Sequence, residues 1–456
     1  MLAKPTAKRW TPRSPARIDA AILVGLLVAI SVGHGQNLPD YELAPIHYST
    51  TEPDNPVATL RARLAAGEAV LSGGREKQTL AQCLSLLDVS PASQVLLFSR
   101  TSLQRRLIHP DHPRALYFSD DCYVGWVPGG LMEVAHSDPQ LGLVFYRLDA
   151  RQADQTARLE RDDECLSCHA GPLTRGWPAL MVRSVYPDAT GEPILRAGSF
   201  LIEHDTPISN RWGGWYVTGS TGSIPHLGNL TFDEPAETTQ ALPQAREETA
   251  DPARRFPTET YLRATSDVLA LLVLEHQVGM HNRLAEGSLR TRKWMHYQQS
   301  LQTELGEPVS EQPTGTALRV VQNEARRIVR HLLFAEEAAL PPEGIQGDPA
   351  FVEAFRANRR EDARARSLKD FDLQTRLFRW RCSYLIYSQA FDGLPPVLKA
   401  AVYDRLDEVL GSEAPPPEFT YLDRQEREDI RTILRATKPE LAARWPAASP
   451  AERPRR

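Results

Sequence analysis

The sequence has 456 residues, of which 41% are hydrophobic and 24% charged, and its formal net charge is −5. A chain of this length can bury the cores of two domains, so we expect more than one. The acidic balance and the lack of a basic stripe argue against a nucleic-acid-binding protein.

The first 35 residues have the pattern of a secretory signal peptide. Five basic side chains precede an apolar run over residues 20–33, which is too short to span a membrane comfortably. Gly33 and Gly35 suit the −3 and −1 positions of a cleavage site before Gln36. Cleavage there would change the net charge from −5 to −9. We therefore expect an exported chain in the bacterial periplasm, attached to a membrane only if this segment remains as an uncleaved signal anchor.

Residues 36–235 carry a mixed pattern of short helices and short strands. Spaced Leu and Ala residues predict two short helices within residues 57–87. Runs of β-branched and aromatic residues, separated by Gly and Pro, predict strands. These runs are residues 93–98, 115–118, 142–148, 180–186 and 215–218.

The second half of the chain has a helical pattern. Residues 236–259 are rich in Pro, Glu, Thr and Ala, which predicts a linker or a long surface loop. Apolar residues at three- and four-residue spacing then predict helices within a domain at residues 260–440. These helices are residues 260–285, 317–337, 370–390, 396–410 and 423–437. Residues 441–456 read as a flexible tail. The fold class is therefore α+β, with a mixed N-terminal half and a mainly α-helical C-terminal half.

The most specific motif is Cys165-Leu-Ser-Cys168-His169, a C-x-x-C-H sequence. With 5 Cys and 12 His in the chain, chance produces roughly 10⁻³ such motifs. This spacing allows two thiols to form thioethers with a haem, while the adjacent imidazole becomes the proximal iron ligand. A redox dithiol should follow an apolar strand, but Arg161-Asp-Asp-Glu164 precedes this one. A zinc site would need a second Cys/His pair at similar spacing, which the sequence lacks.

The sequence does not determine which group is the sixth iron ligand. A Met ligand, a His ligand or a vacancy would give a high-potential carrier, a low-potential carrier or a site for small ligands. The main candidates lie on one predicted helix: His276 and Met280 share a face, and His281 follows. Met181 is twelve residues past the proximal histidine, and an extended segment of that length reaches ~35 Å. His204 is a further candidate.

An aromatic segment, residues 211–219, follows the motif. Its sequence is Arg-Trp-Gly-Gly-Trp-Tyr-Val-Thr-Gly. Large rings beside paired glycines could wall a flat macrocycle, or they could belong to a tightly turned strand in an aromatic core. The remaining cysteines, Cys83, Cys122 and Cys382, allow at most one disulfide.

The C-x-x-C-H motif resembles the attachment site of c-type cytochromes. Several longer phrases are similar to large exported monohaem proteins of environmental bacteria that contain a cytochrome c domain. These phrases are Pro113–Phe118, Asp120–Trp126, Leu141–Tyr146, Arg211–Gly219 and Leu274–Gln277. The resemblance implies one covalently bound haem c in residues 36–235, but it implies no particular reaction. The chain is longer than small soluble cytochromes c and lacks their compact helical module with its methionine loop.

Two main function classes follow. The first is electron transfer by one covalent haem, with redox partner proteins of the periplasm or membrane. The second is a haem-dependent oxidoreductase that acts on a small substrate between the two halves. A haem-based sensor or a structural haem protein is a third possibility. Sequence alone leaves open whether the chain is an enzyme.

Overall fold

The computed structural model describes residues 38–72, 75–150, 158–233 and 252–445. Residues 1–39 and 40–456 form separate units, and every element below belongs to the second. The predicted signal peptide lies outside the described residues, as do residues 234–251 of the predicted linker region and the tail beyond residue 445. The division into domains at residues 36–235 and 260–440 stays a prediction.

Within the described residues, seven strands form an antiparallel sheet in the order β6-β5-β4-β3-β2-β1-β9. Their bounds are β1 Val95–Leu97, β2 Arg114–Phe118, β3 Cys122–Trp126, β4 Met132–Asp138, β5 Gly142–Leu148, β6 Leu159–Arg161 and β9 Trp215–Tyr216. Strands β1 to β6 follow one another as a meander, whereas β9 returns from much later in the chain to pair with β1. In that pair Leu96 lies opposite Tyr216. Strands β7 (Arg183–Val185) and β8 (Ser199–Leu201) form a separate two-stranded sheet.

Two N-terminal helices, α2 (Pro56–Ala65) and α3 (Glu76–Leu86), pack with the sheet. Asn55 begins α2, because its side-chain oxygen accepts a hydrogen bond from the Val57 amide at 3.1 Å. The same oxygen accepts a hydrogen bond from the Tyr146 hydroxyl of β5 at 3.1 Å, which fixes the helix to the sheet. The two short helices predicted within residues 57–87 are confirmed.

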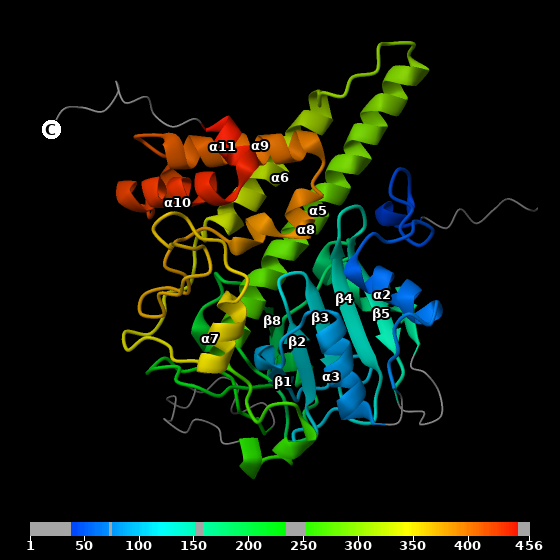
Figure 1. Cartoon of the computed structure of the whole chain (residues 1–456), viewed down its shortest axis with the longest axis vertical. Helices are drawn as coiled ribbons and strands as arrows, with labels where there is room; N and C mark the ends of the chain where they lie inside the picture. The colour runs from blue at the N-terminus through cyan, green and yellow to red at the C-terminus, as the bar shows by residue number, and fades with distance from the viewer. Residues whose placement is uncertain (1–37, 73–74, 151–157, 234–251, 446–456) are drawn as a thin grey trace, which may run out of the picture. The chain divides into compact units, whose positions relative to one another are not determined.

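The C-terminal half is mainly helical, so the predicted α+β class is confirmed. Helix α5 contacts β5 of the sheet, and the pairs α5–α6, α6–α9 and α9–α10 pack together. Figure 1 shows α5 extending from the sheet into the group of C-terminal helices. Among the described helices, none is both long enough and apolar enough to cross a membrane. The bounds are α5 Val268–Glu304, α6 Gly315–Leu332, α7 Pro349–Arg356, α8 Gln389–Asp392, α9 Pro396–Gly411, α10 Arg424–Thr437 and α11 Pro439–Arg444.

The prediction of a helix over residues 370–390 is wrong. That segment contains only a short 3₁₀ helix at Tyr384–Tyr387 and the first residues of α8. The Asp372 carboxylate accepts hydrogen bonds from the amides of Gln374 and Thr375 at 2.9 and 2.7 Å, which folds the chain into a turn. The spaced apolar residues instead fill the core from an irregular backbone.

Candidate functional site

The three functional side chains of the C-x-x-C-H motif lie on one short helical stretch. A 3₁₀ turn at Asp163–Cys165 leads into α4, which spans Leu166–His169. The Asp162 carboxylate caps the turn by accepting a hydrogen bond from the Glu164 amide at 3.0 Å. The Cys165 side chain is partly buried and that of Cys168 is exposed, and both are free thiols.

A cavity of about 390 Å³ lies at this helical stretch and is lined by Cys165, Cys168 and His169. Its volume falls within the range of about 300–1,000 Å³ that is typical of ligand pockets. The cavity lies over one face of the sheet, where two rows of paired residues form its floor. The rows are Leu116–Gly125–Glu133 and Tyr123–Ala135–Phe145, and Leu274 and Val278 of α5 form part of the wall.

Charge enters this otherwise apolar cavity through arginine side chains. Arg114 on β2 forms an ion pair with Glu133 on β4, and both residues line the cavity. Gly125 lies between them on β3, and a Cβ atom there would collide with the Arg114 guanidinium. Arg183 also lines the cavity. The cavity therefore combines a large apolar surface with one arginine–glutamate pair and a second arginine.

The His169 imidazole is held by a hydrogen bond and a ring contact. Its Nδ1 lies 2.8 Å from the Ala179 carbonyl oxygen, so Nδ1 carries the proton and Nε2 has the free lone pair. The ring of Phe145 lies 4.8 Å from the His169 ring, centroid to centroid. Burial lowers the pKa of His169. A neutral imidazole with an outward-facing Nδ1–H donor is the usual form of a metal-ligating histidine.

Met181 lines the same cavity as His169. Its segment is fastened to α5 through both polar atoms of one amide side chain. The Leu180 amide donates a hydrogen bond to Asn282 Oδ1 at 2.9 Å, and Asn282 Nδ2 donates one to the Leu180 carbonyl at 2.8 Å. Met181 therefore enters the cavity from a fixed backbone.

The other distal candidates have different surroundings. His276 Nδ1 lies 3.0 Å from His204 Nδ1, and Met280 is fully buried in the core. His281 Nδ1 lies 2.6 Å from the hydroxyl of Tyr123, which itself lines the cavity. None of these histidines and methionines is among the lining residues. An iron ligand from α5 stays a prediction. Met181 is better placed than these candidates, because it lines the cavity.

The aromatic segment after the motif divides its rings between the cavity and the core. Trp215 lines the cavity, and its Nε1 donates a hydrogen bond to the Arg183 carbonyl at 2.8 Å. Trp212 is buried elsewhere and donates to the Glu275 carboxylate at 2.8 Å. Tyr216 packs in the core. One ring of the segment therefore walls the cavity while the others stabilise the fold.

Sequence reasoning did not identify Arg114, Glu133 and Asn282. The first two are charged residues within strand-forming sequences, and such a residue on a buried strand face usually has a partner of opposite charge. That pattern could have indicated a polar position in the sheet. The role of Asn282 depends on which loop lies beside α5, so no local signal exists for it.

A second polar cluster forms where α5 packs against other segments of the chain. His204, His276 and His331 form the one group within the described part of the chain whose ligand atoms could hold a metal ion together. All three side chains are buried, and burial lowers their pKa values, that of His204 to about 3. Each imidazole is therefore neutral near pH 7.

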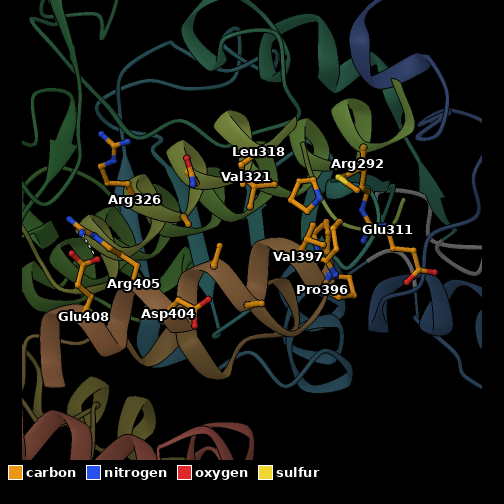
Figure 2. Close-up of a pocket in the computed structure, with 18 of the residues that line it drawn as sticks. Arg292, Glu311, Leu318, Val321, Arg326, Pro396, Val397, Asp404, Arg405 and Glu408 are labelled. Carbon is orange, nitrogen blue, oxygen red and sulfur yellow. Dashed lines mark hydrogen bonds and ion pairs between the residues drawn. The ribbon is translucent and has the colours of Figure 1, made fainter. Parts of the chain in front are cut away.

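A larger cavity, of about 1500 Å³, lies among α5, α6 and α9. Figure 2 shows Val321 and Val397 in its wall and Arg405 paired with Glu408 at its edge. The cavity lies apart from the C-x-x-C-H motif, so volume alone does not identify the site with the most specific chemistry.

Comparisons of the chain with known protein families, curated proteins and solved structures find no match. A functional assignment therefore rests on the residues and geometry of the sites themselves.

Proposed function

We propose that this chain is an exported c-type cytochrome that exchanges electrons with redox partner proteins of the periplasm or membrane. One haem c would be attached through Cys165 and Cys168, with His169 as the proximal ligand. The observation that carries the proposal is that both thiols and this imidazole line one cavity over a largely apolar sheet face. Export rests on the sequence of residues 1–35, which lie outside the described residues.

The residues of the cavity suit a flat macrocycle. Phe145 and Trp215 supply flat rings, and Gly125 makes room for the Arg114 guanidinium that lies across it. Arg183 can bind a carboxylate that a haem carries, whereas Arg114 is already paired with Glu133. Bound haem would supply reversible one-electron transfer.

The proximal side is organised by the backbone. The Ala179 carbonyl accepts the His169 Nδ1 proton at 2.8 Å, which fixes the ring orientation and makes Nε2 a stronger donor. Phe145 packs against the same ring, so the imidazole has little freedom to turn away from the cavity.

We propose Met181 as the distal ligand. It lines the cavity, and the Asn282 amide holds the adjacent backbone from both sides. Thioether ligation raises the reduction potential of a haem relative to a second imidazole. A six-coordinate haem with this ligand would favour electron transfer over the binding of small molecules.

One observation favours a second function, a haem-dependent oxidoreductase. The Tyr123 hydroxyl lies 2.6 Å from His281 Nδ1, and His281 Nε2 lies 3.3 Å from an Asp121 carboxylate oxygen. Tyr123 also lines the cavity. A tyrosine–histidine–aspartate chain of this kind can supply or remove a proton at a bound substrate.

The test is covalent haem retention after periplasmic expression with the cytochrome c maturation machinery. Wild-type chain should keep its haem stain through denaturing electrophoresis. Each of the variants Cys165→Ala and Cys168→Ala can form at most one thioether, and the double variant can form none. The double variant should therefore lose the stain completely.

The matched control is Cys382→Ala, which removes a buried thiol away from the cavity and should stain as strongly as wild type. A wild-type chain that carries no covalent haem would overturn the proposal. So would a double variant that stains like wild type.

A further inference from the structure

The histidine cluster joins three distant segments of the chain. His204 follows β8, His276 lies on α5 and His331 lies on α6. Their exposed fractions are 6%, 0% and 3%. One candidate ligand atom from each residue lies within 4.8 Å of the other two. Three imidazoles so close together in a dry interior need either a shared proton network or a shared cation.

The Nε2 atom of each ring has a polar partner, which for His331 is the backbone of another member of the cluster. His204 Nε2 lies 3.2 Å from the Ala335 carbonyl oxygen, and His331 Nε2 lies 3.1 Å from the carbonyl oxygen of His276. His276 Nε2 lies 2.7 Å from Ser383 Oγ. Histidine ligands usually bond their second nitrogen to a carbonyl or hydroxyl in this way, which orients the first nitrogen toward the metal. In His204 and His276 this orientation leaves the two Nδ1 atoms facing each other, whereas His331 lies stacked on both rings.

The inner nitrogens are already close to metal-site spacing. The Nδ1 atoms of His204 and His276 are 3.0 Å apart. Two imidazole nitrogens that ligate one tetrahedral Zn²⁺ at about 2.0–2.1 Å lie roughly 3.4 Å apart. The two Nδ1 atoms therefore need to move apart only slightly to ligate one ion. The His331 ring is nearly parallel to the other two, at 16° and 2°, so it must turn about its Cβ–Cγ bond to direct a ring nitrogen at the same ion.

The helix backbone leaves room for the third ring. Gly279 lies on α5, and a Cβ atom there would come within 2.8 Å of the His331 ring. Glycine weakens a helix interior, so its position facing an imidazole indicates that the close approach of His331 matters. Phe334 covers the cluster, with its ring 4.1 Å from that of His276.

Nearby carboxylates are paired with arginines and do not occupy the site. Glu275 accepts a hydrogen bond from Arg211 at 2.6 Å, and Glu203 pairs with Arg283 at 2.5 Å. The ligand set is therefore three neutral imidazoles. Imidazole donors suit Zn²⁺, Cu²⁺ and related divalent ions, and do not suit Ca²⁺ or Mg²⁺.

We propose that His204, His276 and His331 bind one divalent transition-metal ion, of the Zn²⁺ class, with Nδ1 of His204 and Nδ1 of His276 as two of the three donor atoms. This site is separate from the cavity at the C-x-x-C-H motif, because His276 is two residues from both Leu274 and Val278 and faces the other side of α5. The proposal therefore does not depend on haem attachment.

The experiment measures Zn²⁺ binding to untagged, chelator-treated chain by competition with a chromophoric chelator. Haem-loaded chain is used, because thioether formation removes the two motif thiols as competing ligands. Wild type should bind one equivalent of Zn²⁺. The variants His331→Gln and His204→Gln should each weaken binding by more than about 100-fold, because each removes a direct ligand.

The matched control is His296→Gln. His296 lies on the same helix, twenty residues from His276, which is about 30 Å along the axis. This variant should bind Zn²⁺ as wild type does. The chain with both Cys165→Ala and Cys168→Ala should also bind one equivalent, and this result separates failure of the metal site from failure of haem attachment.

X-ray absorption at the zinc edge of the wild-type complex gives a second measurement that needs no variant. A first shell dominated by imidazole nitrogens would support the site, even if the glutamine variants fail to fold. No uptake of Zn²⁺ or Cu²⁺ by wild type would overturn the proposal. An oxygen-rich shell, or unchanged affinity in folded His331→Gln, would also overturn it.

Discussion

The two faces of helix α5 contribute to their sites in opposite ways. On one face, Leu274 and Val278 form apolar wall for the cavity at the C-x-x-C-H motif, and the potential ligands come from other segments. On the other face, His276 is itself a member of the polar cluster. Residues two apart on a helix are about 200° apart around its axis. A single turn of α5 therefore presents an apolar wall to the cavity on one face and a histidine ligand candidate on the opposite face.

The two sites also differ in how they are encoded. Both thiols and the proximal imidazole of the cavity come from five consecutive residues, so a short motif reveals them. The histidine cluster combines His204, His276 and His331, which only the tertiary fold brings together. A local site can be recognised from a sequence, whereas a site assembled from separate elements requires the packing of those elements.

The largest predicted effect concerns the buried ion pair that anchors the histidine face. Arg211 and Glu275 are 3% and 0% exposed, so Arg211→Met leaves a carboxylate buried without its partner. We expect the free energy of unfolding, measured by urea denaturation, to fall by roughly 3–5 kcal/mol. Arg283→Met removes a more exposed pair with Glu203 and should cost at most about 1 kcal/mol. Equal losses in the two variants would contradict the distinction between a fully buried and a partly exposed ion pair.

A spectroscopic prediction distinguishes the two faces directly. Met181→Ala should convert low-spin haem to high-spin haem, open the iron to carbon monoxide and cyanide, and lower the reduction potential by about 0.1 V. His276→Ala, Met280→Ala and His281→Ala should leave the Soret band unchanged, since their side chains do not line the cavity.

Wild-type chain that already binds carbon monoxide would argue against Met181 ligation. It would favour the oxidoreductase or sensor alternatives. A Soret shift in His276→Ala alone would instead place the distal ligand on the histidine face of α5. The haem would then be served by that face and not by the face of Leu274 and Val278.

The smallest predicted effect lies at the start of α5 and should act on both faces equally. Asp267 caps the helix by accepting a hydrogen bond from the Ala270 amide at 3.0 Å. Burial raises its pKa from 3.8 to about 6. The folded state therefore favours protonated Asp267, so this contribution to stability is full below about pH 4 and is lost as the pH rises past 6.

Asp267→Asn removes this titration and keeps one oxygen that can cap the helix, but the oxygen that accepts a hydrogen bond from the Asp348 amide at 2.7 Å becomes an NH₂ group, a loss that does not vary with pH. Relative to wild type, the variant should gain about 1–2 kcal/mol of stability between pH 4 and pH 7, as measured by denaturation at each pH. Asp423→Asn, at the exposed cap of α10, should show no such gain. A stability difference that stays constant with pH for Asp267→Asn would refute the titration.

Much of the fold could be predicted from the sequence, and the exceptions have physical causes. Strands β1, β2, β5, β7 and β9 and helices α5, α6, α9 and α10 each fall within or overlap a predicted segment. Strands β3 and β4 were not predicted. Residues 132–138 alternate poorly because most of their side chains are buried, and polar groups such as His136 are satisfied internally. Strands buried on both faces lose the alternating pattern that sequence reasoning depends on.

Helix α5 was recognised but its length was not. The prediction placed it at residues 260–285, whereas it begins after the Asp267 cap and continues to Glu304. Beyond residue 290 most of its residues are only partly buried or exposed, so the apolar spacing that marks a helix fades there.

The motif of the candidate site could be predicted, but its surroundings could not. The rows that form the floor depend on strand register, which places Gly125 opposite Glu133 and Tyr123 opposite Ala135. A shift of one residue would turn every one of these side chains to the other face. The same limit applies to Met181, whose position depends on the Asn282 contact.

The late pairing of β9 with β1 has a consequence for biogenesis. Leu96 pairs with Tyr216, so the C-x-x-C-H motif lies in the stretch of chain between these two paired strands. The pairing can form only after β9 has been delivered. A chain that emerges from its N-terminus delivers the motif before β9 and before the α5 wall, and long-range pairings form slowly. Under the proposed haem attachment, the thiols of Cys165 and Cys168 would thus meet the attachment machinery while their cavity is still open on one side. Covalent loading can then precede closure of the sheet and does not require a finished fold to reopen.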